Sequence, residues 1–165
     1  MKIMYGRCAI AGCALLIAGQ GVVAADSAKE ATFETMNCYA GPQQVITDGK
    51  GAVGFSYETV GTPMSKEGDL LYRSNIRCVG SGISIGGQLE QSGSCVVTDR
   101  DGDRFFFFYS GRNQEPGPWK ILEGTGKFEG MEGSGTWAPV LMPAKPARAD
   151  IIQSCNRETG HWKLK

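Results

Sequence analysis

A run of four consecutive phenylalanines constrains the fold of this chain more than any other feature. It lies within residues 104–109, a segment too short and too rich in β-forming residues to be anything but a strand between turns. Turn-forming residues precede it at 99–103, and closely spaced glycines follow it at 124–135. The stretch 93–137 therefore predicts neighbouring strands joined by tight turns.

The middle of the chain has the two-residue alternation of strands with one buried face. Residues 43–47 and 52–60 are strand-like, and the composition of 48–51 favours a turn between them. The buried row of the second strand is predicted to be Val53, Phe55, Tyr57 and Thr59. The next buried row is predicted to be Leu70, Tyr72, Ile76 and Cys78. No segment after residue 25 has a helical period, so the fold class is predicted to be all-β.

A two-residue turn at Asp101 and Gly102 would set the register of the phenylalanine strand. This turn places Cys95 opposite Phe108, and directly opposite residues share a face. If Cys95 points inward, Phe106 and Phe108 point inward as well. The other row would then face outward, and it comprises Phe105, Phe107 and Tyr109. Because an exposed aromatic row needs cover, we expect either a homo-oligomer interface through this row or packing by the C-terminal segment.

The first 25 residues have the pattern of a cleaved export signal. Lys2 and Arg7 supply the positive charge, residues 8–18 are apolar, and 23–25 form a small-residue cleavage site. The apolar part is too short to cross a bilayer as a helix. A lipoprotein signal processed at Cys13 is the alternative, although its apolar region would then be very short. Residues 26–165 are thus predicted to form a single domain, periplasmic or secreted, without an integral membrane segment.

The charge balance argues against a polyanionic partner. Signal cleavage would leave 140 residues with 15 basic and 17 acidic side chains and no basic cluster, so no nucleic-acid partner is predicted. The glycine segment also fails the phosphate-loop patterns. A dinucleotide fingerprint would need glycine at Glu129, and a P-loop would need Ser or Thr at Phe128.

The exported chain keeps an even number of cysteines, which in an oxidising compartment predicts two disulfides. Three pairings are allowed. Antiparallel pairing of residues 69–79 with 91–99 brings Cys78 opposite Cys95, which leaves Cys38 to pair with Cys155. Free or metal-binding thiols are the alternative, but the chain has no CxxC pair after the signal.

An aspartate cluster and a single histidine are the remaining candidates for a site of chemistry. Asp99, Asp101 and Asp103 resemble the start of a calcium loop, but the glycine and the later glutamate are misplaced, and turn chemistry explains the composition. We therefore predict no metal site. The single histidine, His161, has no nucleophile pattern to complete a Ser-His-Asp triad and is predicted to be an ordinary surface residue.

The C-terminal part is predicted to form a connector and a final strand. Residues 139–146 are rich in proline and predict an extended connector, and residues 149–155 predict the last strand. A turn is expected at 158–160. If Cys38 and Cys155 are joined, the last strand pairs with the strand at 33–39.

Close glycine spacing around one aromatic residue marks the segment 124–133. It is interpreted as a structural motif that bends the backbone around a buried ring, with the members Gly124, Gly126, Phe128, Gly130 and Gly133. This segment resembles the glycine motif of the allene oxide cyclase and dirigent barrels. The aspartate loop followed by an aromatic strand is similar to secreted bacterial relatives of those barrels. The resemblance covers roughly residues 70–141, about half of the mature chain.

The resemblance implies a single antiparallel closed barrel of about eight strands with an apolar lumen, often trimeric in plant members. Those members use no cofactor; one cyclises a fatty-acid epoxide and the other steers the coupling of phenolic radicals. Their acidic catalytic residues have no matching positions here, so the catalytic residues stay unassigned, with Glu58 and Glu90 as weak acidic candidates.

Three functions follow. The first is binding of a small apolar or aromatic molecule in a lumen lined by Phe55, Tyr57, Tyr72, Phe106, Phe108 and Trp119. The second is a cofactor-free isomerase or cyclase that acts on a lipid- or phenol-derived substrate. The third is an envelope interaction protein whose core is filled by its own side chains.

Overall fold

A computed structural model of the chain describes residues 29–140, 148 and 150–165. Its strands follow one another as β1 (Glu30–Thr47), β2 (Val53–Met64), β3 (Asn75–Ile85), β4 (Gln88–Thr98), β5 (Arg104–Arg112), β6 (Gly117–Gly124), β7 (Glu132–Val140) and β8 (Ile151–Lys163). One short 3-10 turn, η1 (Gly126–Phe128), precedes β7. The predicted export signal and residues 141–146 of the predicted connector lie outside the described residues.

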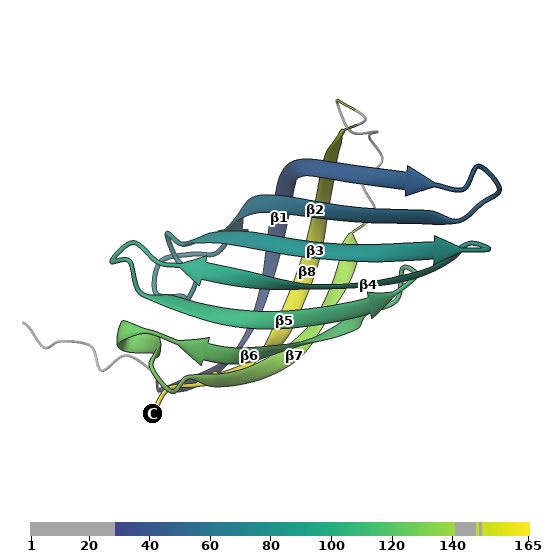
Figure 1. Cartoon of the computed structure of the whole chain (residues 1–165). Coiled ribbons are helices and arrows are strands. Elements are labelled where there is room, and N and C mark those ends of the chain that lie inside the picture. Colours follow the sequence, from purple (N-terminus) through teal and green to yellow (C-terminus); the bar gives the residue numbers. More distant parts are fainter. Residues whose placement is uncertain (1–28, 141–147, 149) are drawn as a thin grey trace, which may run out of the picture.

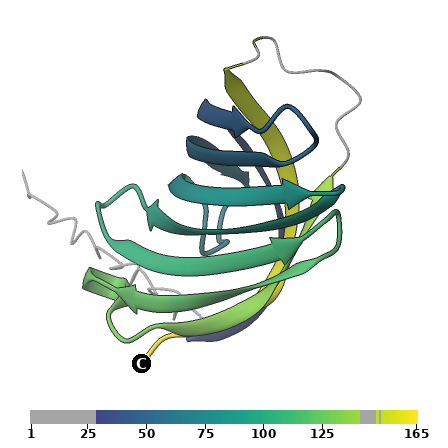
Figure 2. The same ribbon diagram turned by 45° about the vertical axis from the view of Figure 1, so that its right-hand side comes forward.

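The eight strands form a closed antiparallel barrel in which each strand pairs with its neighbours in sequence (Figure 1). Closure comes from the pairing of β1 with β8 over residues 30–42, while β1 also pairs with β2 over 36–47. Figure 2 shows β8 running up the back of the barrel beside β1. The predicted fold class is therefore confirmed.

Both predicted disulfides are present. Cys38 lies directly opposite Cys155 across β1 and β8, and their bond fastens the strands that close the barrel. Cys78 lies opposite Cys95 across β3 and β4. The two bonds lie on different faces, because Cys78 and Cys95 belong to the buried rows of their strands, whereas Cys38 lies between the buried Asn37 and Tyr39. One disulfide thus lines the interior and the other is on the outer wall.

The predicted register of the phenylalanine strand is wrong by one residue. Arg104 pairs with Thr98, so the connection between β4 and β5 has five residues in place of two. The carboxylate of Asp99 accepts hydrogen bonds from the backbone N–H groups of Asp101 (2.8 Å) and Asp103 (3.0 Å), which stabilises this longer loop.

A one-residue slip moves every side chain of a strand to the other face. Phe105 and Phe107 are each 6% exposed inside the barrel, whereas Phe106 and Phe108 are 41% and 42% exposed on its outer wall. The predictions that Phe106 and Phe108 line the lumen, and that Phe105, Phe107 and Tyr109 form a subunit interface, are therefore wrong.

Two other local predictions are corrected. Tyr72 was assigned to a strand facing the lumen, but it lies in the turn that precedes β3, half-buried, while its neighbour Leu71 packs in the core. The turn expected at 158–160 does not form, because β8 continues through it to Lys163. Gly160 serves close packing instead: a side chain there would meet the ring of Trp119 at 2.4 Å.

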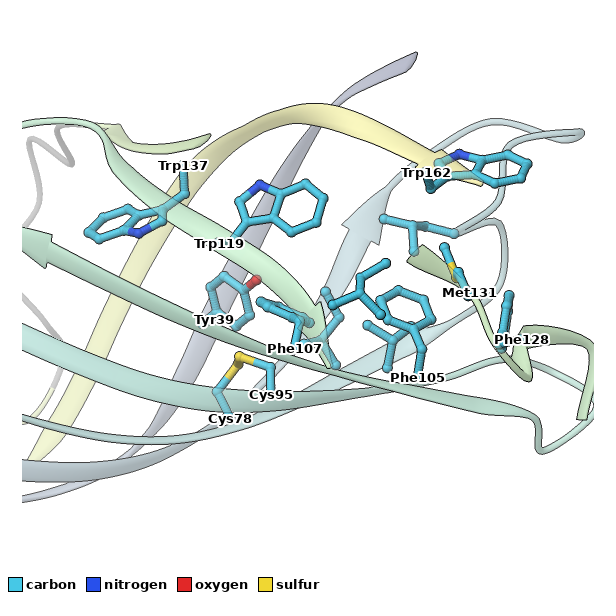
Figure 3. Packing of buried hydrophobic residues seen from close by; sticks show 14 residues of the cluster. Tyr39, Cys78, Cys95, Phe105, Phe107, Trp119, Phe128, Met131, Trp137 and Trp162 are labelled. Atoms are coloured by element: carbon cyan, nitrogen blue, oxygen red, sulfur yellow. A yellow bond between two sulfur atoms is a disulfide. The ribbon is translucent and has the colours of Figure 1, made fainter. Parts of the chain in front are cut away.

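The interior has a packed end and a cavity end. The packed end contains the connections β2–β3, β4–β5 and β6–β7 and both termini of the described barrel. Its filling side chains are Leu71, Ile76, Val97, Phe105, Ile121, Phe128, Met131 and Trp162. Only about 20 Å³ of space remains among them. Figure 3 shows Phe105, Phe128, Met131 and Trp162 gathered at this end.

The predicted glycine motif helps to close the packed end. Gly126 and Gly130 adopt φ values of +57° and +68°, which favour glycine, and the turn between them points Phe128 into the core. Phe128 is 1% exposed and meets the ring of Phe105 edge-on at 5.2 Å. Lys127 forms an ion pair with Asp99 and so ties this turn to the β4–β5 loop.

Within the described part of the chain, no helix is long and apolar enough to span a bilayer.

Candidate functional site

The cavity end of the barrel encloses a cavity of about 330 Å³. Every strand contributes at least one side chain to its deep part: Tyr39, Tyr57, Cys78, Cys95, Tyr109, Trp119, Trp137 and Glu158. Toward the mouth, the lining includes the neutral amides Gln91, Asn113, Gln114 and Gln153. The site therefore combines an aromatic interior with a polar, uncharged entrance.

Three of the side chains predicted to bind a ligand line this cavity, namely Phe55, Tyr57 and Trp119. Phe55 and Tyr57 lie on the predicted inward face of β2, with their rings 6.1 Å apart. The other three do not line it: Phe106 and Phe108 face outward, and Tyr72 lies in the turn at the packed end.

Inward glycines make room for the large rings. A Cβ on Gly111 would lie 2.3 Å from Cζ2 of Trp137, and one on Gly135 would lie 2.7 Å from Cζ2 of Trp119. Trp119 on β6 therefore packs directly against the backbone of β7, and Trp137 on β7 packs against the backbone of β5. This arrangement explains why inward glycines alternate with inward aromatics around the wall.

The two tryptophans are fixed by hydrogen bonds at their edges. The Nε1–H group of Trp137 donates to the carbonyl of Ser110 at 2.9 Å, and that of Trp119 donates to the carbonyl of Thr136 at 3.3 Å. Trp137 also meets the ring of Tyr109 edge-on, with 6.0 Å between centroids. The polar atoms of both indoles are thus satisfied by the wall, which leaves their π systems as the surface available to a ligand.

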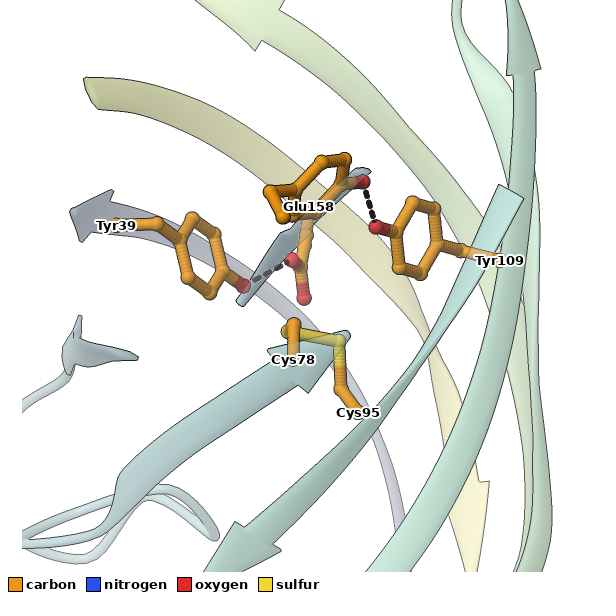
Figure 4. Close-up of a disulfide and its surroundings, with 6 residues drawn as sticks. Tyr39, Cys78, Cys95, Tyr109 and Glu158 are labelled. Atoms are coloured by element: carbon orange, nitrogen blue, oxygen red, sulfur yellow. Dashed lines mark hydrogen bonds between the residues drawn. A yellow bond between two sulfur atoms is a disulfide. The ribbon is translucent and has the colours of Figure 1, made fainter. Parts of the chain in front are cut away.

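Glu158 is the buried carboxyl group of the cavity. It is 8% exposed and lies on β8 directly across from Trp137. The hydroxyl of Tyr39 donates a 2.9 Å hydrogen bond to its Oε1 atom (Figure 4). Burial raises the pKa of Glu158 above its ordinary value, although the hydrogen bond from Tyr39 opposes the rise. In Figure 4 the carboxyl lies between Tyr39 and Tyr109, next to the Cys78–Cys95 disulfide.

Two other tyrosines face each other across the lumen. The hydroxyls of Tyr57 and Tyr109 are hydrogen-bonded to one another. Burial raises the pKa of both phenols, and for Tyr109 the neighbouring Tyr57 and Glu158 add to the effect. Burial likewise raises the pKa of Tyr39, and Glu158 adds to that rise. All three phenols are therefore neutral at physiological pH.

Asn37 extends the polar group behind Tyr39. It is fully buried on the inward face of β1, and its amide lowers the pKa of both Tyr39 and Glu158. Neither polar atom of its amide makes a hydrogen bond of ordinary geometry to the described residues. A buried amide left in this state is costly, so Asn37 supports a polar environment at the cost of local stability.

Glu158 was missed in the sequence because Glu158, Thr159 and Gly160 resemble a turn. The informative signal was the even-numbered row Glu158, Gly160 and Trp162, which continues the strand alternation. The two weak acidic candidates of the sequence, Glu58 and Glu90, lie on the outer wall. Glu58 pairs with Arg77 at 2.8 Å, and Glu90 pairs with Arg112 at 3.1 Å.

The site has the chemistry of a neutral, hydrogen-bonding aromatic cage. Among the described residues that line it there is one carboxyl group, Glu158, and no lysine, arginine or histidine. Its hydrogen-bonding groups are phenols, amides, the hydroxyls of Thr59 and Ser154, and this carboxyl. Such a lining can hold an apolar or aromatic body while a few polar groups fix its orientation.

No family model and no curated protein matches the sequence. Two solved structures of pterocarpan synthase dirigent proteins are similar in fold. The first, GePTS1, is 11% identical, with 83% of this chain and 93% of that chain covered and a TM-score of 0.49. The second, PsPTS1, is 12% identical, with 82% and 96% covered and a TM-score of 0.49. The closed eight-stranded barrel of this chain is defined by its own strand pairing.

Proposed function

We propose that this protein binds a small molecule with an apolar or aromatic body in the cavity end of its barrel. The observation that carries the proposal is the contrast inside one barrel: one end is filled by its own side chains, while the other keeps about 330 Å³ among aromatic rings. Cavities that hold small ligands begin at about 300 Å³. This contrast supports a binding protein over an envelope interaction protein with a self-filled core.

We also propose that the protein works after export, in the periplasm or outside the cell. Two disulfides, one on each face of the wall, support an oxidising compartment.

Binding can be tested by titrating the purified protein with 2-naphthol, a neutral aromatic probe, in a calorimeter. Gln91 lines the cavity, and Gln91→Trp should fill its entrance and weaken binding at least about ten-fold. The matched control is Ser92→Trp, one position along β4 and on the outer face, which should bind like wild type. Absence of saturable binding, or equal binding by both variants, would contradict the proposal.

Native mass spectrometry of protein purified from its own compartment would complement the titration. A retained small molecule is the expected result, and its mass would restrict its chemical class.

A second candidate is a cofactor-free isomerase or cyclase, which the position of Glu158 favours. A carboxyl whose pKa is raised by burial, inside a cavity and bonded to Tyr39, is suited to general acid–base catalysis. The test is turnover of a panel of epoxides and phenols. If the enzyme hypothesis is right, Glu158→Gln should lower the rate by about 100-fold or more without weakening binding in proportion. Turnover that survives this substitution would exclude Glu158 as the acid or base.

A further inference from the structure

We propose that the molecule bound in the cavity carries a positively charged nitrogen, as an amine or quaternary ammonium group, on its apolar or aromatic body. This inference rests on the proposed binding function and names the class of ligand. It is carried by two features of the deep cavity, the single buried carboxyl of Glu158 and the aromatic rings that surround it.

The first feature is the absence of any compensating cation among the described residues of the cavity. Buried carboxylates in proteins are normally paired with a basic side chain. Even two exposed acids on the outer wall have basic partners, since Glu58 is paired with Arg77 and Glu90 with Arg112. Glu158 is more buried than either, yet its hydrogen bond comes from the phenol of Tyr39. A ligand cation would supply the missing partner.

The second feature is the identity of the rings. Cations are attracted to the faces of tryptophan most strongly, then to those of tyrosine and phenylalanine. The deep cavity contains Trp119, Trp137, Tyr39, Tyr57, Phe107 and Tyr109. Cages of this composition are the usual binding sites of quaternary ammonium groups. An anionic ligand, by contrast, would meet the carboxyl of Glu158 and find no basic side chain among the described lining residues.

No charged side chain among the described neighbours of Glu158 competes with a ligand cation for its carboxylate. Tyr39 faces it from β1, Tyr57 lies across the lumen on β2, and Tyr109 faces it from β5. The raised pKa of each phenol keeps it neutral. The remaining neighbours do not titrate, since β3 and β4 contribute the disulfide and β7 contributes Trp137.

Proton release is the expected signature of such a ligand. Burial raises the pKa of Glu158 in the free protein, so the carboxyl holds its proton at a pH where an exposed glutamate would be ionised. A bound cation favours the ionised form and therefore lowers this pKa. Affinity for the cation should rise with pH up to the pKa of the free protein and level off above it.

The test compares two probes of nearly the same shape. Benzyltrimethylammonium carries a permanent charge, and neopentylbenzene is its neutral counterpart, with carbon in place of nitrogen. We expect the wild-type protein to bind the cation at least about ten-fold more tightly than the neutral probe at pH 8. Calorimetry in buffers of different ionisation enthalpy should show release of about one proton per cation bound in the pH range where affinity changes.

A matched pair of variants isolates the carboxyl. Glu158→Gln keeps an oxygen that can accept the bond from Tyr39 but removes the charge, and it should abolish both the preference for the cation and its pH dependence. Glu123→Gln, on the exposed surface of β6, should behave like wild type. Binding of neopentylbenzene by Glu158→Gln would show that this variant is folded, and the proton release measured on wild type needs no variant.

The outcomes separate the inference from the proposed function. If the neutral probe binds as well as the cation or better, the inference is overturned and the binding proposal stands. A preference for the cation that survives in Glu158→Gln also overturns it, because the carboxyl then plays no part. If neither probe nor 2-naphthol binds, the binding proposal itself fails.

Discussion

The two ends of the barrel use the same alternation of inward side chains to opposite effect. At the packed end, Phe128 is 1% exposed and almost no free space remains. At the cavity end, the inward rings are separated by glycines and leave about 330 Å³. The difference does not arise from a lack of aromatic residues, because both ends contain several.

The connections between strands explain much of this difference. Those at the packed end send large apolar side chains inward, namely Leu71 from β2–β3 and Phe128 and Met131 from β6–β7. Two of the connections at the cavity end consist of turn residues, at 48–52 and at Gly86 and Gly87, and none of these residues packs in the core. The comparison teaches that loops that fill the interior stabilise the barrel, while the opposite end is left free for a ligand.

The largest expected effect is a loss of stability when the core of the packed end is disrupted. Phe128→Ala should lower the free energy of unfolding by about 3 to 5 kcal/mol, because the surrounding core cannot collapse fully onto the lost ring. Its control is Phe106→Ala, which removes the same side chain from the outer wall and should cost less than about 1 kcal/mol. Urea denaturation of both variants measures the difference. Equal losses would show that Phe128 does not anchor the core.

A smaller effect is expected in the loop that set the register of β5. Asp99→Ala should destabilise the protein by about 1 to 3 kcal/mol, because two backbone N–H groups and Lys127 lose their acceptor. The matched control is Asp101→Ala, in the same loop, whose carboxylate is more than half exposed. That variant should change stability by less than about 0.5 kcal/mol in the same urea experiment. Similar losses of stability in both variants would show that Asp99 does not stabilise the loop.

The smallest expected effect tests the cavity end, through the pH dependence of the protein's stability. The pKa of Glu158 is raised above the ordinary 4.5, so the folded state holds a proton that the unfolded state releases once the pH exceeds 4.5. The contribution of the neutral carboxyl is therefore complete below pH 4.5 and is lost as the pH rises toward the folded-state pKa, by about 1.4 kcal/mol per pH unit.

Glu158→Gln should remove this loss. The variant should match wild type near pH 4 and be the more stable protein at higher pH, as measured by thermal unfolding across the pH range. Glu123→Gln provides the control, since its exposed carboxyl should give a curve parallel to wild type. A Glu158→Gln curve that stays parallel to wild type as well would mean that the carboxyl is not held neutral in the folded state.

The amino-acid sequence was sufficient for those features that depend on local pattern. Two-residue alternation predicted a strand at the position of β2, and the run of β-forming residues predicted β5. Cysteine count with antiparallel pairing predicted the Cys78–Cys95 and Cys38–Cys155 bonds. Closely spaced glycines predicted the bend that carries Phe128, where Gly126 and Gly130 adopt positive φ values. These predictions succeed because turn chemistry and strand period act within a few residues of the chain.

Only the tertiary structure decided which faces point inward and which carboxyl is buried. The register of β5 depended on how Asp99 bonds its own loop and on the ion pair with Lys127, a residue more than 20 positions away. Glu158 is a lumen group because β8 continues as a strand through the apparent turn, where Gly160 leaves room for the ring of Trp119. A strand has two equivalent faces in its sequence, and it is the closure of the whole barrel that makes one of them the interior.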